Sequence, residues 1–558
     1  MLKFLGCQPT IGGQLHCACR NSHLISTFGA LVVIGICSFF LRAACAFWFR
    51  GMIDGEGAEY ARIAQNLVAG VGYVGIATEG TQLIFPPLFP LLIAAVSYLV
   101  GSAEIAGRVI SVTAGACVVV PAYLIGKWLY GERVGVLGAA LTAVHPFLVK
   151  LSSSVHVEPT YLTIVLMAIY MTLRAMECPK PRILFAMGAL FGIGFLLRQE
   201  ALAYAAIGSA LLLTMAAYKR FGDQIALLGR LPLVLIGFLL VTGPYISWLS
   251  VQTGEFRIQG KTPLNLATES RVQQGMSVEE AAFGVEPGLI VSGIWMRPSL
   301  VTIQQHRMNT AEIASLLRKR AYVVIKDASA TIAGGLELGS PFLFAFAILG
   351  IFVRPMSRRL VVATGYFATI LALVPFGLLF TYIHDARFYV LFVPFLCIWS
   401  VLGIRQFGVW AARSARNMDV SSLRRSTIVT VGQTIAILII LLPSAVIAAS
   451  RLSGERAERP FKQAVMDVAA DRSEPIRIAD TSTSAAFHAR ADFVWLPYCD
   501  ESTALEFIKK NKVTHVILRN LEGRPYLSKW LNEGVPGARQ IVNLSGAGRR
   551  FMIYEIYR

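Results

Sequence analysis

Residues 24–49 read LISTFGALVVIGICSFFLRAACAFWF, and Arg42 is the only charged residue in this stretch. About 20 apolar residues are enough to cross a bilayer as a helix. The run is longer than the core of a secretory signal peptide, and no small-residue cleavage motif leading into a soluble domain follows it. We therefore interpret it as an uncleaved first transmembrane helix, with the N-terminus in the cytoplasm.

The composition of the whole chain agrees with a membrane protein. The 558 residues are 55% hydrophobic and 15% charged, which excludes a purely soluble enzyme. Lys and Arg number 51 against 33 Asp and Glu, giving a net charge of +18. These basic residues form short clusters between apolar runs and no continuous basic face, so nucleic acid is not expected as a partner.

The nine cysteines do not indicate a disulfide framework, because most lie in apolar runs or near the N-terminus. Cys17 and Cys19, flanked by His16 and His23, lack the matching second pair that a structural zinc site needs. We interpret these four residues as part of a cytoplasmic tail.

Ten further apolar runs predict the rest of a helical membrane domain. We expect about eleven transmembrane helices in all, near residues 24–49, 106–129, 133–151, 160–175, 182–197, 200–217, 226–250, 339–353, 360–383, 388–410 and 427–450. With the N-terminus inside, every cytoplasmic connection is basic, as the positive-inside rule requires. The apolar segment 85–101 would reverse that pattern if it crossed the membrane, so we interpret it as a juxtamembrane or re-entrant helix.

Domain boundaries follow from the same pattern. Residues 1–450 form the membrane domain, with long outer loops at 50–105 and 251–338, and an N-cap residue at Asn309 predicts a helix through Ile325 in the second loop. We interpret that loop as a lid or as a passive cap. The charged composition after residue 451 predicts a soluble domain at 451–558, and the odd number of transmembrane helices places it outside the cytoplasm.

Short buried strands and helical runs predict a small α/β fold for this C-terminal domain. We expect strands at residues 476–480, 513–518 and 551–557 and a helix at 503–511. His488 and His515 have no neighbours in sequence with catalytic or ligand spacing, so both are expected to be structural or surface residues.

The first outer loop carries three carboxylates beside the membrane. Residues 53–67 read IDGEGAEYARIAQNL, a pattern that predicts an amphipathic helix on the bilayer surface. Glu56 and Tyr60 would lie one turn apart on the same face of that helix. Asp54 lies two residues before Glu56. Carboxylates at a membrane face are costly unless they are solvated or used.

The other outer loops supply one more acid and several cations. Glu158 ends the loop at residues 152–159, where it either serves a function or interacts with the dipole of the following helix. Arg108, Arg198 and Arg387 lie at interface depth, and His384 precedes Arg387 in the same short loop. Each cation could snorkel to lipid headgroups or hold a phosphate. Carboxylates, phosphate-binding cations and an apolar bundle on one side of the membrane suit chemistry on a lipid phosphate.

At these residues the sequence resembles the GT-C superfamily of membrane glycosyltransferases. Within it, the sequence is similar to the protein mannosyltransferase and lipid A aminoarabinose transferase family. The resemblance covers roughly residues 30–400 and rests on residues 56–73, Pro86–Pro90, Tyr130–Arg133, Ser154–Pro159, Leu197–Leu202 and Arg387–Tyr389 with Pro394. The family's usual residue four positions before the tyrosine is Asp, whereas this chain has Glu56 there.

The resemblance implies an enzyme that uses a polyprenyl-phosphate-linked sugar as donor and works on the extracytoplasmic face. Glu56 or Asp54 would be the general base, and Glu158 would orient acceptor or sugar. Arg198 and Arg387 would neutralise the leaving phosphate, with Tyr60, Arg108 and His384 also in the substrate site. A single base acting in a direct displacement gives inversion at the anomeric carbon. No metal or other cofactor is expected, although Glu56 and Glu158 could bind a metal, as in some relatives.

The sequence is also compatible with other functions. A secondary transporter would also have about eleven helices, but transporters place their charged sites near the bilayer midplane. A glycan polymerase or ligase of the same superfamily and a non-catalytic assembly subunit are further alternatives. The acceptor is a lipid, a glycan or a protein. The expected location is the bacterial inner (plasma) membrane.

Overall fold

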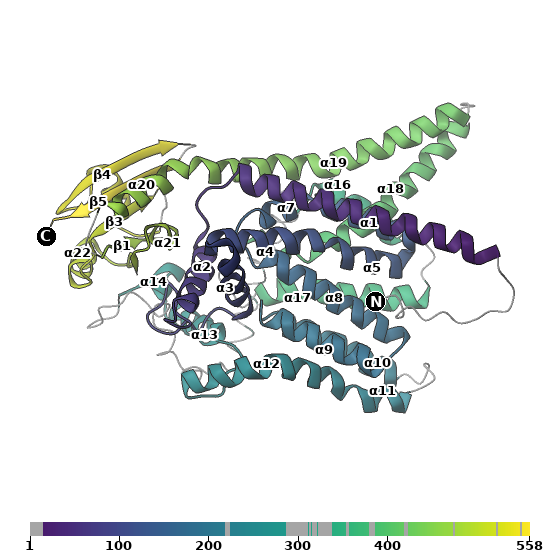
Figure 1. Ribbon diagram of the computed structural model, residues 1–558, viewed down its shortest axis with the longest axis horizontal. Coiled ribbons are helices and arrows are strands. Elements are labelled where there is room, and N and C mark those ends of the chain that lie inside the picture. The colour runs from purple at the N-terminus through teal and green to yellow at the C-terminus, as the bar shows by residue number, and fades with distance from the viewer. Residues whose placement is uncertain are drawn as a thin grey trace.

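The computed structural model describes residues 15–217, 224–285, 338–352, 357–378, 385–417, 422–471, 475–519, 523–546 and 549–557, with residues 311, 314, 318 and 321 in isolation. Long helices lie side by side along the longest axis of the molecule, and a small sheet lies at one end of them (Figure 1). The expected helix at 309–325 and His384 fall outside the continuous described segments.

The bundle is built from the apolar runs of the sequence. Its helices are α1 (Leu15–Trp48), α4 (Ala103–Cys117), α5 (Val119–Tyr130), α6 (Glu132–Val144), α7 (Pro146–Ser152), α8 (Glu158–Glu177), α9 (Pro181–Phe195), α10 (Ala201–Ala217), α11 (Gln224–Arg230), α12 (Pro232–Thr253), α16 (Pro341–Phe352), α17 (Arg358–Leu378), α18 (Phe392–Asn417) and α19 (Ser422–Ala457). Each of the eleven expected spans coincides with one or two of these helices. The helix α1 begins at Leu15, so Cys17 and Cys19 lie in its first turns, before the apolar stretch Thr27–Trp48. The cytoplasmic location expected for them stays a prediction.

The number of helices that cross the membrane stays a prediction. Seven of the described helical stretches are long and apolar enough to cross, and α6 with α7 makes an eighth if the bent pair is one span. The expected span at 133–151 is bent by 56° between α6 and α7. The bend occurs at His145 and Pro146, because a proline donates no backbone hydrogen bond and starts a new helix. The helices α9, α10 and α16 are apolar but shorter.

Small residues bring bundle helices into close contact. A Cβ added at Gly188 of α9 would lie 1.9 Å from the carbonyl oxygen of Val234 on α12, and one added at Gly237 would lie 2.4 Å from that of Phe185. Only glycine permits such an approach of two backbones. The side chains between the helices form one continuous apolar core that includes Phe191, Leu166 and Phe367.

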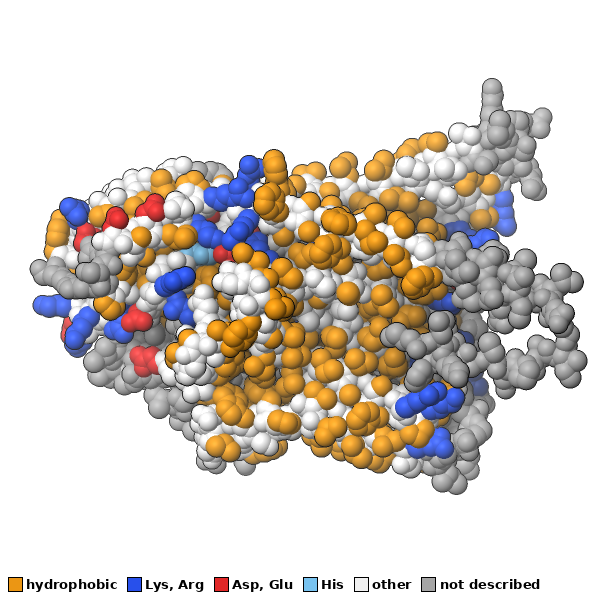
Figure 2. All heavy atoms as spheres, in the orientation of Figure 1, with side chains coloured by type: hydrophobic (Ala, Val, Ile, Leu, Met, Phe, Trp, Pro, Cys, Tyr) orange, Lys and Arg blue, Asp and Glu red, His pale blue; other side chains and the backbone are white. Residues whose placement is uncertain are grey.

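The outer surface of the bundle has the distribution expected for a bilayer. Hydrophobic side chains cover the middle of the visible face, Lys and Arg gather at both ends, and the visible Asp and Glu side chains lie only at the end that carries the sheet (Figure 2). Large apolar side chains such as Phe28, Leu240 and Phe352 are more than two-thirds exposed. Such exposure of apolar surface is costly in water and favourable in lipid. The protein is therefore an integral membrane protein.

Short helices cover one end of the bundle. They are α2 (Gly55–Val68), α3 (Leu88–Val100), α13 (Lys261–Gln273), α14 (Val278–Phe283) and the 3-10 turn η6 (Ala386–Tyr389). The helices α2 and α3 lie next to the C-terminal domain (Figure 1). The helix expected from the amphipathic pattern of residues 53–67 is thus present as α2, and the apolar segment 85–101 forms α3.

The C-terminal part is an α/β domain with a five-stranded mixed sheet. Its elements are α20 (Arg459–Ala470), β1 (Arg477–Asp480), α21 (Ser484–Ala489), β2 (Asp492–Trp495), α22 (Glu501–Lys510), β3 (His515–Arg519), α23 (Leu527–Glu533), β4 (Ala538–Gly546) and β5 (Arg549–Ile556). The strand order is β2-β1-β3-β5-β4. The strand β1 pairs in parallel with β2 and β3, whereas β5 pairs antiparallel with β3 and β4. The three expected strands and the expected helix correspond to β1, β3, β5 and α22.

This domain contacts the helix α2 directly. Thr483 Oγ1 donates a hydrogen bond of 2.9 Å to the carbonyl oxygen of Gly55, and Arg62 Nη2 donates one of 3.1 Å to that of Ala486. The indole of Trp495 donates to the carbonyl oxygen of Ala77, at 3.1 Å. The helix α19 continues through residue 451, so the backbone has no break where the composition changes.

Candidate active site

The N-terminus of α2 is fixed by Asp54. This residue is the N-cap of the helix, and its Oδ1 accepts a hydrogen bond of 2.6 Å from the backbone N–H of Gly57. Asp is among the best N-cap residues because its carboxylate satisfies a donor that the helix leaves free. The cap fixes the first turn of α2, which carries Glu56.

Glu56 is paired with Arg387. Its Oε2 lies 2.9 Å from Arg387 Nη1, although the two residues are 331 positions apart in the chain. Arg387 is itself fixed by Asp385, which caps η6 by accepting from the Arg387 backbone N–H at 2.9 Å and contacts Arg387 Nε at 3.2 Å. The same guanidinium lies 3.7 Å from Glu158 and 3.9 Å from Asp54. One cation therefore faces four carboxylates.

Glu158 lies deepest in the site. It is 1% exposed at the first position of α8, and its Oε1 accepts a hydrogen bond of 2.7 Å from Arg198 Nη1. Its Oε2 has no hydrogen-bond partner in the described part of the chain. Arg198 also donates to Glu200 at 2.9 Å, and its guanidinium lies over the rings of Tyr161 and Phe388. Two aromatic rings thus lie within about 6 Å of the guanidinium, which favours a cation.

His156 is a member of this site that the sequence did not indicate. Its Nδ1 lies 3.6 Å from Asp54 Oδ2 and 3.8 Å from Glu158 Oε2. Its backbone is held by Ser111 Oγ, which donates to the His156 carbonyl oxygen at 2.9 Å. We call Asp54, Glu56, His156, Glu158, Arg198, Glu200, Asp385 and Arg387 the carboxylate cluster.

Electrostatics keep Glu56 ionised at neutral pH. Burial by itself would raise the pKa of Glu56, but the positive charges of Arg387, Lys261 and Arg198 outweigh it and lower that pKa below its ordinary value. The carboxylate is therefore available to accept a proton, and 38% of its side chain is exposed. Its partner Arg387 is an obvious contact for a phosphate, because Arg recognises phosphate through two parallel hydrogen bonds.

Tyr60 lies close enough to the carboxylate cluster for the charges of Glu56, Glu158 and Arg198 to act on its hydroxyl, and Glu59 supports the loop that follows α2. The ring of Tyr60 packs edge-on against Phe85 and Phe89 and is 4% exposed. Burial raises the pKa of Tyr60 well above its ordinary value, so the hydroxyl stays protonated. Glu59 accepts hydrogen bonds from the backbone N–H groups of Ile76 and Ala77 at 2.8 and 3.0 Å. These contacts tie α2 to the loop that follows it.

Arg108 lies in a second charged group, away from the carboxylate cluster contacts. Its Nε is 3.3 Å from Glu104 on the preceding turn of α4, and its Nη1 donates to the Ser153 carbonyl oxygen at 2.7 Å. Glu104 also contacts Arg50 at 3.5 Å, Lys462 at 2.9 Å and His488 at 4.0 Å. We call Arg50, Glu104, Arg108, Lys462 and His488 the Glu104 cluster.

The structure thus brings together five of the eight expected site residues: Asp54, Glu56, Glu158, Arg198 and Arg387. It adds His156, which contacts Asp54 from a distant segment and has no signal in one sequence. It also adds Glu200 and Asp385, which lie two residues from Arg198 and Arg387 and contact them. Among the residues that the structure describes, no three Asp, Glu, His or Cys side chains are arranged to hold a metal ion. The carboxylates of the cluster are paired with arginines. The expectation that the reaction needs no metal ion stays a prediction.

Comparisons with known proteins bear on this site. Residues 85–248 match the model of the family described as dolichyl-phosphate-mannose-protein mannosyltransferase. No curated protein matches the chain in sequence.

Several solved structures share its fold. The structure of ArnT from Cupriavidus metallidurans bound to undecaprenyl phosphate aligns with a TM-score of 0.54 and 12% identity over 96% of this chain and 98% of that one. The archaeal oligosaccharyltransferase AglB from Archaeoglobus fulgidus, in complex with an inhibitory peptide and a dolichol-phosphate, gives 0.54 and 14% over 88% of this chain and 69% of that one. A structure of the A. fulgidus oligosaccharyltransferase with Zn and sulfate gives 0.56 and 14% over 88% and 67%.

Together these findings confirm the resemblance inferred from the sequence. The chain is similar to GT-C proteins of the mannosyltransferase and aminoarabinose transferase type, and it has their helical membrane fold with a small C-terminal sheet domain.

Proposed function

We propose that this GT-C-like protein is a membrane glycosyltransferase that moves a sugar from a polyprenyl-phosphate donor to an acceptor hydroxyl. The observation that carries the proposal is the carboxylate cluster, in which two arginines that suit a phosphate lie against an ionised, half-exposed glutamate. Two of the structurally similar proteins contain undecaprenyl phosphate or dolichol-phosphate, which supports the class of donor.

The proposed reaction is a direct displacement at the anomeric carbon. A bond forms between the acceptor oxygen and that carbon while the bond from the carbon to the phosphate oxygen breaks. The hydroxyl proton passes to a carboxylate, and the polyprenyl phosphate leaves with the electron pair. A displacement with one base inverts the anomeric configuration. The sugar is a hexose or a pentose, and the acceptor is a lipid, a glycan or a protein.

We assign the general base to Glu56 and the cap to Asp54. Glu56 has no hydrogen bond to the backbone of α2 and is paired through a single contact of 2.9 Å with Arg387. Asp54 already has one carboxylate oxygen committed to the Gly57 N–H, at 2.6 Å. A phosphate that binds Arg387 would compete for that guanidinium and leave the Glu56 carboxylate free for the acceptor proton.

The remaining members have supporting roles in the proposal. Arg387 and Arg198 neutralise the charge that develops on the leaving phosphate. Glu158 holds Arg198 at 2.7 Å and orients the sugar or the acceptor with its second oxygen. Tyr60 and Arg108 shape the site, because Tyr60 packs α2 against Phe85 and Phe89 and Arg108 holds the Ser153 carbonyl oxygen at 2.7 Å.

We further propose that the site faces the extracytoplasmic side of a bacterial inner membrane. The acidic side chains of the visible face lie at the end with the sheet, whereas the opposite end is basic (Figure 2). The positive-inside rule then places the basic end in the cytoplasm. In this arrangement residues 1–450 form the membrane domain with outer loops at 50–105 and 251–338, and residues 451–558 form an extracytoplasmic domain that covers α2.

The proposal is tested by measuring transfer of radiolabelled sugar and release of polyprenyl phosphate in membranes that contain the protein. The variants are Glu56→Gln, Asp54→Asn and Glu158→Gln. Glu279→Gln is the matched control, because Glu279 forms an ion pair with Arg524 and lies outside the carboxylate cluster. We expect the wild type and the control to release the carrier phosphate and Glu56→Gln to lose that activity.

Two outcomes would contradict the proposal. If the wild type releases no carrier phosphate with any of a panel of polyprenyl-phosphate sugars, the alternatives are a secondary transporter and a non-catalytic assembly subunit. If only polyprenyl diphosphate oligosaccharides are consumed, the protein is a glycan ligase or polymerase.

A further inference from the structure

The first turn of α2 carries Glu56 between two glycines, Gly55 and Gly57. Glycine lowers the intrinsic stability of a helical turn, because it loses more backbone freedom on folding than any other residue. The Asp54 cap satisfies one backbone donor of this turn. The position of the Glu56 carboxylate therefore also depends on the contacts that other segments make with the two glycines.

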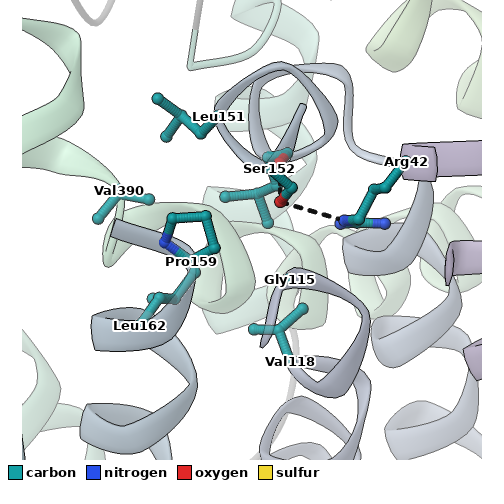
Figure 3. Close-up of a pocket in the computed structure, with 9 residues that line it drawn as sticks. Arg42, Gly115, Val118, Leu151, Ser152, Pro159, Leu162 and Val390 are labelled. Carbon is teal, nitrogen blue, oxygen red and sulfur yellow. Dashed lines mark hydrogen bonds between the residues drawn. The ribbon is translucent and has the colours of Figure 1, made fainter. Parts of the chain in front are cut away.

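The helix bundle makes the first of these contacts. A Cβ added at Gly57 would lie 2.7 Å from the carbonyl oxygen of Val155, so the turn approaches the segment 152–159 closely. This segment is held by the bundle in turn, because Arg42 on α1 donates to Ser152 Oγ at 3.3 Å (Figure 3). The contact at Gly57 thus rests on a part of the bundle that is itself fixed.

The C-terminal domain makes the second contact. Thr483 Oγ1 donates a hydrogen bond of 2.9 Å to the carbonyl oxygen of Gly55, across 428 positions of sequence. A Cβ added at Gly55 would lie 3.5 Å from the same hydroxyl oxygen, so the two segments are in van der Waals contact. Thr483 is 2% exposed. Burying a hydroxyl is costly without a hydrogen bond, so this bond favours one docked position of the domain on α2.

The loop that carries Thr483 is held by its own domain. Asp480 at the end of β1 is 0% exposed, accepts from Arg519 Nη2 at 2.8 Å and accepts from the backbone N–H of Thr481 at 2.6 Å. Thr483 is the N-cap residue of α21, and its carbonyl oxygen accepts from the Phe487 N–H at 3.1 Å. A threonine at this position usually caps its own helix with its side chain. The Thr483 side chain makes no such cap bond and reaches α2 instead.

We propose that Thr483 is a positioning residue for Glu56. Through the Gly55 carbonyl oxygen it holds the first turn of α2, and so keeps the Glu56 carboxylate beside Arg387, where the acceptor proton is taken up. The inference rests on the proposed glycosyl transfer, and it makes the C-terminal domain part of the site's framework. A small misplacement of a catalytic group lowers the rate by a large factor, so one hydrogen bond at this turn affects turnover.

The test measures polyprenyl phosphate release and deuterium exchange of the backbone amides of residues 55–60 in the purified full-length protein. Thr483→Val removes the hydroxyl and keeps the branched side chain. We expect kcat to fall about tenfold with less than about a twofold change in the KM for the donor, because the lost bond positions Glu56 and not the arginines that contact the phosphate. The amides of the first turn should exchange faster. Thr483→Ala should give the same result, and it replaces Thr483→Val if that variant does not fold.

Two further variants serve as controls. Thr483→Ser keeps the hydroxyl and should retain the kcat and the slow exchange of the wild type. Thr503→Val is the matched control, because it removes a threonine hydroxyl of the same domain that donates to Asp500 at 2.7 Å, and it should behave as the wild type.

Three outcomes would overturn the inference. They are unchanged kcat and exchange in both Thr483→Val and Thr483→Ala, an equal loss of activity in Thr483→Ser, and an equal loss in Thr503→Val. The exchange measurement does not depend on activity, so it separates this inference from the proposed function. If the wild type releases no polyprenyl phosphate while Thr483→Val still exchanges faster at residues 55–60, the proposed function is wrong and the hold of Thr483 on the turn is supported.

Discussion

The carboxylate cluster and the Glu104 cluster have opposite charge ratios, although both lie at the same end of the bundle. In the first, two arginines are contacted by five carboxylates, those of Asp54, Glu56, Glu158, Glu200 and Asp385. In the second, a single carboxylate is contacted by Arg50, Arg108, Lys462 and His488. The excess of acids in the carboxylate cluster leaves carboxylates available for proton transfer. The excess of cations around Glu104 instead holds the surrounding helices together.

The exposure of Glu56 in the carboxylate cluster and of Glu104 in the Glu104 cluster agrees with these two roles. The side chain of Glu56 is 38% exposed, whereas that of Glu104 is 8% exposed. Glu104 on α4 contacts Arg50, which follows α1, Lys462 on α20 and His488 on α21, and so connects the bundle to the C-terminal domain. A substrate can reach Glu56, but it would have to separate the two domains to reach Glu104.

The largest effect should follow loss of the Glu56 carboxylate. Glu56→Gln should lower turnover by about 10²–10⁴-fold, the usual contribution of a general base. Asp54→Asn should lower it by less than about tenfold, because Asn caps a helix as well as Asp does. The measurement is the rate of polyprenyl phosphate release at saturating donor.

Asp54→Ala serves as the control for the cap, since it removes both the charge and the hydrogen-bond acceptor. If Asp54→Asn loses as much activity as Glu56→Gln, the base is Asp54 and our assignment is wrong.

A change in the Glu104 cluster should affect stability more than chemistry. Glu104→Gln leaves several buried cations without their partner, and removing one member of a buried ion pair costs roughly 3 kcal/mol or more. We expect a clearly lower Tm in thermal unfolding. Glu132→Gln is the matched control, because its pair with Lys127 at 3.8 Å is about two-fifths exposed and surface pairs contribute little. If Glu104→Gln and Glu132→Gln had equal Tm values, the Glu104 cluster would not have the stabilising role that we assign to it.

Lowering the pH should weaken the contact between the helix bundle and the C-terminal domain, because protonation of His488 is unfavourable in the folded protein. Burial, together with the charges of Lys462, Arg108 and Arg50, lowers the pKa of His488 to about 3, despite the opposing effect of Glu104. Between pH 6.5 and pH 3 the unfolded state therefore binds a proton that the folded state does not. Stability contributed by the neutral imidazole is present above pH 6.5 and decreases as the pH falls towards 3.

Lowering the pH from 7 to 5 should thus cost the wild type about 2 kcal/mol of unfolding free energy from this group. His488→Gln should show a flatter dependence of Tm on pH over that range. A variant with the same slope as the wild type would show that His488 is not the group that titrates.

The smallest effect is expected from chelation of metal ions. The described carboxylates of the site are paired with Arg198 and Arg387, so EDTA should leave the release of polyprenyl phosphate unchanged. A loss of activity that a single divalent cation restores would contradict this expectation. It would also mean that the acid excess of the carboxylate cluster serves to bind a metal.

Much of the fold was predictable because it depends on local patterns. Apolar run length predicts the bundle helices, and the pattern of residues 53–67 predicts α2. The bend between α6 and α7 was missed, since the apolar run continues through His145 and Pro146. The strands β2 and β4 were also missed. The four residues of β2 are too few for a clear alternation, whereas β4 has nine residues.

The site was predictable only in part, for a physical reason. Topology predicts that outer-loop residues share one side of the membrane, and so brings Glu56, Glu158, Arg198 and Arg387 to the same region. It does not predict which residues touch. His488 meets Glu104 across 384 positions of sequence, so this partnership has no sequence signal. The pair of Arg108 with Glu104 could have been found, because the two residues lie four positions apart on one helix.

The near-continuous helix from α19 into α20 has a mechanical consequence. Residues Val429–Ala470 form a near-continuous helical segment of 42 residues, about 63 Å long. Its length is about twice the thickness of a hydrocarbon core of about 30 Å. The sheet domain follows the C-terminal end of this helix. An apolar helix segment longer than the local hydrocarbon core accommodates the mismatch by tilting. Tilting of α19 moves the sheet domain relative to α2. The length of the lipid chains should therefore affect how the C-terminal domain packs against α2.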